Sequence, residues 1–165
     1  MLTYHVASHK DIPKLRALAE QIWRASYVEM LSPAQMDYML RWMYSAEKIW
    51  QELSLGVHWE IVRLGGEDAG YLALTFEADG IAKLDKLYLL PAHHGRGFGQ
   101  QMLAHADALA GKNGAREIRL QVNKANLRAQ KAYDRFGFVR IDEAVFDIGG
   151  GFVMDDFIMA RKVEN

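Results

Sequence analysis

The stretch "LYLLPAHHGRGFGQQML", residues 87–103, joins an apolar run to a helix-like pattern through a turn with glycines at positions 95, 97 and 99. Glycine lacks a Cβ atom, so the backbone can approach a ligand closely and adopt positive φ. A helix N-terminus has unpaired N–H groups and a partial positive charge, which suit an anion. Arg96 can add a charge-assisted contact. The turn therefore predicts a pyrophosphate site, and a turn that is merely tight is the alternative.

Two familiar phosphate-binding patterns do not fit this turn. Met102 stands where the third glycine of the dinucleotide pattern G-x-G-x-x-G would lie, and the preceding strands are expected to form a meander rather than a βαβ unit. The pattern G-x-x-x-x-G-K-[ST] also fails, because no Lys-Ser or Lys-Thr pair follows the glycines. What remains is a row of backbone amides at the start of a helix.

The composition limits the classes of protein that the chain can represent. Its 165 residues, half of them hydrophobic and a quarter charged, predict one domain over residues 1–165. The net charge is -1, so the basic excess of a nucleic-acid binder is missing. The chain has no cysteine, which excludes disulfides and thiolate metal sites. No metal ligand set stands out and no stretch approaches a membrane span, so we expect a metal-free, cytoplasmic protein without membrane contact.

Hydrophobic periodicity predicts a mixed α/β sheet. Helices are expected at residues 10–30, 31–44, 45–53, 98–114 and 124–137, with Ser32 and Ser45 as N-caps. Strands are expected at residues 2–8, 57–64, 70–78, 81–90, 115–122, 138–148 and 152–163. Asp79-Gly80 indicates a two-residue hairpin turn, and Gly111, Gly114 and Gly137 are expected near helix ends.

The glycine turn resembles motif A of the GNAT superfamily of acetyl-CoA-dependent acetyltransferases. That motif, Q/R-x-x-G-x-G/A, falls on His94, Gly97 and Gly99, and His94 departs from the usual Gln or Arg. The resemblance implies that the strand before the turn contacts the pantetheine arm and acetyl group, and that loop amides bind the CoA pyrophosphate. The positions concerned are Leu87, Tyr88 and Leu89 on the strand, and His94, Gly95, Arg96, Gly97, Phe98, Gly99 and Gln100 in the loop. We expect His94 to weaken CoA binding modestly.

The segment "VNKANLRAQKAYDRFGF" resembles motif B of the same family. Asn126, Ala129 and Tyr133 recur every three or four residues and would lie along one helix face. The resemblance implies that Asn126 bonds the CoA arm and that Tyr133 protonates the leaving thiolate. A helix-start polar residue and a core aromatic are the structural alternatives. The implied fold is a central, mostly antiparallel twisted sheet of six to seven strands flanked by helices.

The residues that would serve the acceptor are less clearly marked. Asp85 has the same strand parity as Leu87 and Leu89 and is a candidate general base, with a solvated strand charge as an equal alternative. Tyr27 and Glu29 belong to a segment rich in aromatics and methionine, which in relatives lines the acceptor cleft. Most aromatics of that segment are expected in the helix core instead. In the acidic pair Asp155-Asp156, one side chain must face opposite to the other.

The function predicted is acetyl transfer from acetyl-CoA to a primary amine of a small acceptor, in the manner of bacterial diamine and polyamine acetyltransferases. Acetylation of protein N-termini or lysines is an alternative, and so are a non-catalytic CoA-binding module and a nucleotide-phosphate binder. A homodimer is expected only by analogy with relatives.

Overall fold

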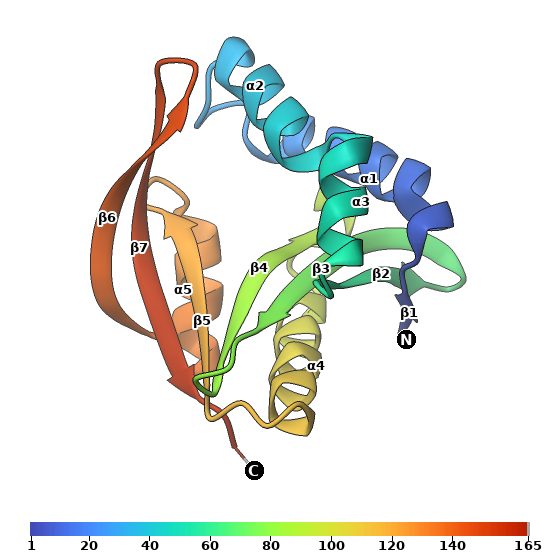
Figure 1. Ribbon diagram of the computed structural model, residues 1–165, viewed down its shortest axis with the longest axis vertical. Coiled ribbons are helices and arrows are strands. Elements are labelled where there is room, and N and C mark those ends of the chain that lie inside the picture. Colours follow the sequence, from blue (N-terminus) through green and yellow to red (C-terminus); the bar gives the residue numbers. More distant parts are fainter. Residues whose placement is uncertain (165) are drawn as a thin grey trace. The chain divides into compact units, whose positions relative to one another are not determined.

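The computed structural model describes residues 1–164 and contains five α-helices and seven strands (Figure 1). The helices are α1 (Ile12–Ser26), α2 (Pro33–Tyr44), α3 (Ala46–Ser54), α4 (Phe98–Lys112) and α5 (Leu127–Phe136), with short 3-10 turns η1 (His9–Asp11) and η2 (Pro91–His93). The strands are β1 (Leu2–Val6), β2 (His58–Leu64), β3 (Glu67–Phe76), β4 (Ile81–Leu89), β5 (Glu117–Asn123), β6 (Val139–Gly149) and β7 (Phe152–Lys162).

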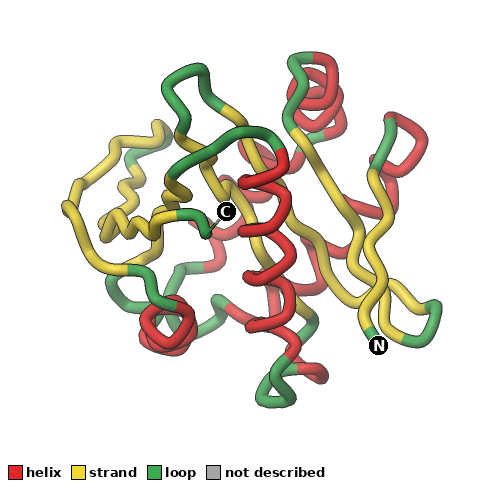
Figure 2. The backbone as a smooth tube through the Cα atoms, turned by 90° about the horizontal axis from the view of Figure 1, so that it is seen from below, coloured by secondary structure: helices red, strands yellow, loops and turns green. Residues whose placement is uncertain are grey.

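The strands form one sheet in the order β1-β2-β3-β4-β5-β7-β6, shown in yellow in Figure 2. The pairs β1–β2, β2–β3, β5–β7 and β6–β7 are antiparallel, whereas β4 and β5 are parallel. The predicted fold class, a mixed and mostly antiparallel sheet of six to seven strands with helices, is confirmed.

The chain divides into two compact units, and each is built from two separate segments. Unit 1 comprises Met1–Leu74 and Lys86–Phe98, and unit 2 comprises Thr75–Asp85 together with the chain from Gly99 onward. The division cuts through β3 and β4, so each unit receives part of both strands.

Helices α2 and α3 of unit 1 begin at the predicted caps. The hydroxyl oxygens of Ser32 and Ser45 accept hydrogen bonds from the amides of Gln35 and Lys48, both at 3.1 Å. Helix α1 ends at Ser26, four residues before the predicted end, because Tyr27 leaves helical geometry (φ −109°, ψ 8°) and its carbonyl then closes a turn with Leu31.

The hairpin turns differ slightly from prediction. Gly65 and Gly66, both with positive φ, form a two-residue turn between β2 and β3, so β3 starts at Glu67 rather than residue 70. The turn at Asp79-Gly80 holds three residues, since the amide of Glu77 bonds the carbonyl of Ile81. Asp79 accepts from the amide of Ile81, which fixes this loop.

In unit 2, helices α4 and α5 are tied to one face of the sheet. Arg161 of β7 lies opposite Ile118 of β5, and its guanidinium bonds Asp107 of α4 at 2.6 Å and the carbonyl of Phe136 in α5 at 3.1 Å. Buried residues of β5 alternate at 118, 120 and 122, which are on that face. Gly111 is next to the last residue of α4, and Gly137 ends α5 with φ 108°, both as predicted.

Strand β4 contains one extra residue relative to β3. The amide of Glu77 bonds the carbonyl of Ile81 near one end, and the amide of Leu90 bonds the carbonyl of Ala69 near the other. Between these pairs β3 advances by eight residues and β4 by nine, which is the signature of a β-bulge. The side-chain alternation of β4 is therefore interrupted. The shared face of Asp85, Leu87 and Leu89 was predicted from strict alternation, which does not hold along the whole of β4, so that shared face stays a prediction.

No helix within residues 1–164 is long and apolar enough to cross a membrane.

Candidate functional site

The glycine turn has the backbone geometry that its sequence predicts. Gly95 (φ 76°) and Gly97 (φ 83°) occupy the left-handed region, which side chains with a Cβ atom rarely adopt. Helix α4 begins at Phe98, directly after these glycines. The first amides of α4, which have no partner within the helix, therefore lie directly after the glycine turn, as the sequence predicts.

Gly99 is different, because its φ is not positive and it lies in the first turn of α4. A Cβ atom built at Gly99 would meet no other atom of the chain within 4 Å. Neither backbone strain nor packing explains the missing side chain. A bare backbone at a helix start fits an anion that approaches the amides closely, as the CoA pyrophosphate would.

His94 connects this turn to the end of β4. Its Nε2 donates a hydrogen bond to the carbonyl oxygen of Leu89 at 2.8 Å. The imidazole, which stands where the family motif has Gln or Arg, therefore holds the turn to the strand. Arg96 is exposed, and its guanidinium lies 4.9 Å from the ring centre of Phe98.

Tyr88 of β4 belongs to an aromatic cluster in unit 1. The cluster consists of Trp23, Tyr27, Tyr44, Trp59, Tyr71 and Tyr88, with ring centres 4.6 to 6.4 Å apart. The Tyr71 hydroxyl donates to that of Tyr44 at 2.8 Å, and Trp23 donates to both hydroxyl oxygens at 3.1 Å. Burial raises the pKa of both tyrosines well above the ordinary value, so they stay neutral.

The predicted acceptor residue Tyr27 joins this cluster. Its hydroxyl donates to that of Tyr88 at 3.3 Å, and its ring packs on Trp23. Tyr27 is thus held beside the strand predicted to bind the acetyl group. Glu29 is exposed in the turn after α1. Trp23 and Met39 are core residues as expected, whereas Trp42 is 43% exposed.

Lys86 was not recognised as a site residue from the sequence, yet it borders the cluster. Its ammonium lies 4.8 Å from the ring centre of Trp59 and 3.7 Å from a carboxylate oxygen of Glu52, and the side chain is buried. No periodic signal distinguishes it from the exposed Lys83 of the same strand.

In unit 2 the residues of motif B lie at α5. Asn126 is the N-cap, since its Oδ1 accepts from the amide of Ala129 at 3.2 Å. That capping bond is the structural alternative foreseen for Asn126, and it leaves the role of its amide group toward CoA as a prediction. Tyr133 is half-buried, with its ring edge-on to Phe138 at 5.9 Å.

Gln100 joins the two helices of unit 2. Its side-chain amide donates to the carbonyl of Ala132 at 2.9 Å, next to Tyr133. The side-chain amide of Gln100 is therefore occupied, and its backbone amide is the group left to bind a phosphate. Gln130, which sequence patterns do not mark, is buried and donates to the carbonyls of Asn123 and Lys124, holding the turn that precedes Asn126.

Two carboxyl groups of unit 2 have contrasting surroundings. Asp85 is exposed and accepts a hydrogen bond from the Thr75 hydroxyl at 2.5 Å. Asp156 is buried, and burial together with the charge of Asp155 raises its pKa to about 6, against a smaller opposing effect of Lys124. Asp156 can therefore carry a negative charge at pH 7.

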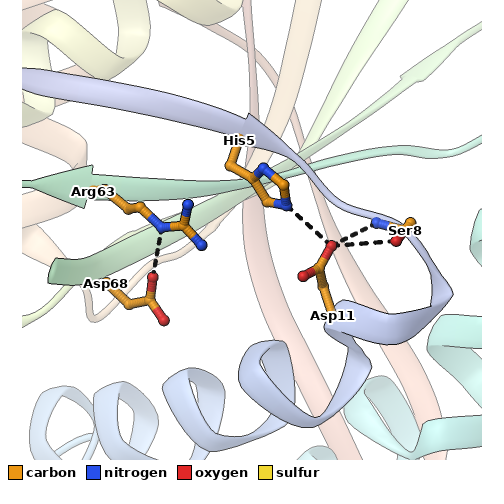
Figure 3. Close-up of polar contacts among 5 residues, drawn as sticks. All are labelled: His5, Ser8, Asp11, Arg63 and Asp68. Atoms are coloured by element: carbon orange, nitrogen blue, oxygen red, sulfur yellow. Dashed lines mark hydrogen bonds and ion pairs between the residues drawn. The ribbon is translucent and has the colours of Figure 1, made fainter. Parts of the chain in front are cut away.

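Ser8, His5 and Asp11 of unit 1 lie together but do not form a nucleophilic triad (Figure 3). His5 Nε2, the Ser8 amide and the Ser8 hydroxyl all approach Oδ2 of Asp11, at 3.1, 2.9 and 3.4 Å. In a triad the imidazole stands between hydroxyl and carboxylate, whereas here the carboxylate is in the middle. The cluster is a capping box ahead of α1.

Metal ligands are not grouped in the described part of the chain: residues 1–164 contain no set of three or more His, Asp or Glu side chains arranged to hold an ion.

The model of the acetyltransferase (GNAT) family matches residues 16–138. The chain belongs to this family. GNAT membership confirms the resemblance drawn from the glycine turn and from the helix bearing Tyr133.

The chain is also similar to individual members of the GNAT family. It is 29% identical over 163 residues to a spermidine N(1)-acetyltransferase of Thermoplasma acidophilum, covering 96% of this chain and 95% of that protein. It is 35% identical over 101 residues to an uncharacterized N-acetyltransferase of Mycobacterium tuberculosis, and this match spans 61% of the chain and only 64% of the mycobacterial protein. Among solved structures, PaiA N-acetyltransferase of Thermoplasma acidophilum in complex with coenzyme A has a TM-score of 0.81 and 26% identity, covering 98% of this chain and 99% of that one.

Proposed function

We propose that the chain transfers the acetyl group of acetyl-CoA to a primary amine of a diamine or polyamine, by direct attack within a ternary complex. The observation that carries the proposal is Gly99, whose missing side chain is explained neither by backbone strain nor by packing within the chain. A binding partner with phosphate groups explains it, because such a partner needs the bare amides of a helix start. The acceptor class is supported by the nearly full-length relative named as a spermidine acetyltransferase.

We propose that both units act as one acetyltransferase domain. Backbone amides of the glycine turn would hold the pyrophosphate, and an amide of β4 near Leu89 would polarise the thioester carbonyl.

The proton transfers can be assigned to side chains of unit 2. Asp85, acting through water, takes one proton from the acceptor ammonium and leaves a neutral amine. The amine nitrogen bonds the thioester carbon, the carbon–sulfur bond breaks, and Tyr133 gives its proton to the leaving sulfur. The second proton of the nitrogen restores the phenol, and the proton on Asp85 passes to solvent. One amide and one free thiol are formed.

The proposal is tested by acetyl-CoA-dependent thiol release against spermidine, spermine, putrescine, amino acids, aminoglycosides and short peptides, with mass spectrometry of the product. We expect the highest kcat/KM with the polyamines. Replacing Tyr133 by Phe should lower kcat by roughly 10²-fold or more while CoA binding is retained, because only the donated proton is removed. Turnover confined to peptides would move the function to protein acetylation, and CoA binding without turnover of any amine would indicate a non-catalytic module.

The base is tested separately with Asp85→Ala, using Lys83→Ala on the same exposed strand face as a control. Loss of the base should flatten the rise of kcat/KM with pH, because deprotonation of the amine would no longer be assisted. A pH profile that matches the wild type would exclude Asp85 as the base.

A further inference from the structure

Asp156, on β7 of unit 2, is a buried acidic side chain with an unsatisfied oxygen. It lies opposite Asn123 of β5 and opposite Ala144 of β6. Its exposed fraction is 1%, and its Oδ1 has no hydrogen-bond partner anywhere in residues 1–164. Buried carboxyl groups are nearly always paired, because an unpaired one costs folding free energy. Such a group calls for an explanation outside the folded chain itself.

The neighbouring Asp155 is an aspartate whose carboxylate is paired within the chain. Asp155 lies on the opposite face of β7, is exposed, and forms an ion pair with the ammonium of Lys124 at 2.9 Å. Lys124 also pairs with Glu143 of β6 at 3.3 Å. The ammonium of Lys124 is therefore ion-paired on the other face; it lowers the pKa of Asp156 through its charge but leaves Oδ1 of Asp156 without a hydrogen bond.

The face of the sheet on which Asp156 lies is the one that α4 and α5 leave uncovered. Strand partners share a face, so Asp156 lies with Asn123, and Arg119 of β5 lies with Lys83 of β4. Burial alternates along β4 from Ala82 to Lys86, which places Asp85 on this face with Lys83, while Arg161 and both helices are on the other face. The carboxyl groups of Asp85 and Asp156 are thus on one face of unit 2, on two strands that are separated by β5.

Building on the proposed function, we propose that Asp156 binds the ammonium group of the acceptor that is not acetylated. A molecule with two ammonium groups separated by several methylene groups can place one near Asp85 and the other at Asp156. The unpaired Oδ1 would receive a charge-assisted hydrogen bond, which is the partner that the chain itself does not supply. Asp156 then selects diamines and polyamines over monoamines without touching the reacting atoms.

The test compares putrescine with butylamine, which has the same carbon chain and a single amino group. Asp156→Asn keeps the shape of the side chain and removes its charge, and Asp155→Asn is the matched control on the opposite face. We expect Asp156→Asn to raise KM for putrescine by about tenfold or more, because one ion-paired hydrogen bond is lost. Its kcat should stay within about twofold, which is the pattern for loss of uniform binding. For butylamine kcat/KM should not change, and Asp155→Asn should match the wild type with both amines.

The outcomes separate this inference from the proposed function. Wild-type enzyme that turns over neither amine, or shows no preference for putrescine, would refute the acceptor class and the role of Asp156 with it. A wild-type preference for putrescine that survives in Asp156→Asn would overturn the inference alone. An equal loss with both amines would also overturn it, since a second ammonium would not be involved. Thermal melting shows whether the variant is folded, and its Tm should equal or exceed that of the wild type.

Discussion

The Nε2–H group of His94 and the carbonyl oxygen of Leu89 are hydrogen-bonded at 2.8 Å, which fixes the glycine turn to the last residue of β4. A carbonyl can only accept, so Nε2 of His94 must carry a proton. His94, the residue that departs from the family motif, therefore links the end of strand β4 to the glycine turn.

Removing this contact should loosen the turn. We expect His94→Ala to weaken CoA binding by about two- to tenfold, the range that one ordinary hydrogen bond contributes. His94→Gln restores the side chain usual in the family and an N–H donor, and should lie between wild type and alanine. Isothermal titration with CoA measures both. Equal affinity of the alanine variant and the wild type would show that the bond does not order the loop.

Gly99→Ala should lower the affinity for CoA while it raises the stability of helix α4. The backbone at Gly99 accepts alanine and the new Cβ atom meets nothing in the chain, so the helix should gain up to about 1 kcal/mol. CoA affinity should nevertheless fall by about tenfold or more, because the methyl group would obstruct the bound pyrophosphate.

Gly114→Ala is the opposite control. Its φ of 82° is unfavourable for alanine, so Tm should fall, while its place after α4 predicts unchanged CoA affinity. If Gly99→Ala bound CoA as tightly as the wild type, the first turn of α4 would not be part of the site.

Asp11 should stabilise the start of α1. Burial raises its pKa, but hydrogen bonds from Ser8 and His5 outweigh that effect, so the net pKa is lowered. Asp11→Ala should reduce the free energy of unfolding by about 1 kcal/mol at pH 7. Because a lowered pKa favours the charged form in the folded state, this contribution should disappear as the pH falls below about 4.

Denaturant unfolding at several pH values measures the effect of Asp11. Asp68→Ala is the control, since it removes the surface pair with Arg63 (Figure 3) and should cost well under about 1 kcal/mol. Unfolding curves that coincide for Asp11→Ala and the wild type at pH 7 would contradict a capping role.

The effect of Asp156 on folding stability should have the opposite pH dependence to that of Asp11. Its pKa is raised from 3.8 to about 6, so between these values the folded state holds a proton that the unfolded chain has released. Stability should therefore fall as the pH rises through this window, and Asp156→Asn should gain between about 1 and 3 kcal/mol at pH 8. The gain should vanish below about pH 4, where the carboxyl is protonated in both states. Thermal melts of the wild type and Asp156→Asn across this pH range test the prediction. A difference in Tm that does not change with pH would contradict the raised pKa of Asp156.

Local signals in the sequence predicted the elements well because caps and turns act within a few residues. Ser32, Ser45 and Gly137 mark helix ends through contacts with near neighbours, and the glycine turn requires only its own backbone geometry. Helix α1 was predicted too long, because the conformation of Tyr27 breaks the helix in a segment whose side chains still suit one.

The remaining features depend on partners distant in sequence. Gln100 bonds the carbonyl of Ala132, and Tyr88 meets Tyr27 across 61 positions, contacts that no periodic pattern reveals. Alternation showed that Asp155 and Asp156 point to opposite faces, but only the pairing of β7 with β5 and β6 determines which one is buried.

The bulge of β4 makes the length of this strand as important as its composition. Deleting the extra residue of β4 would restore an unbroken ladder with β3 and exchange the faces of every side chain on one side of the deletion. A deletion that moved Tyr88 to the other face of its strand would remove it from the aromatic cluster of unit 1. A substitution in this strand leaves its register with β3 unchanged, whereas a change of one residue in its length does not.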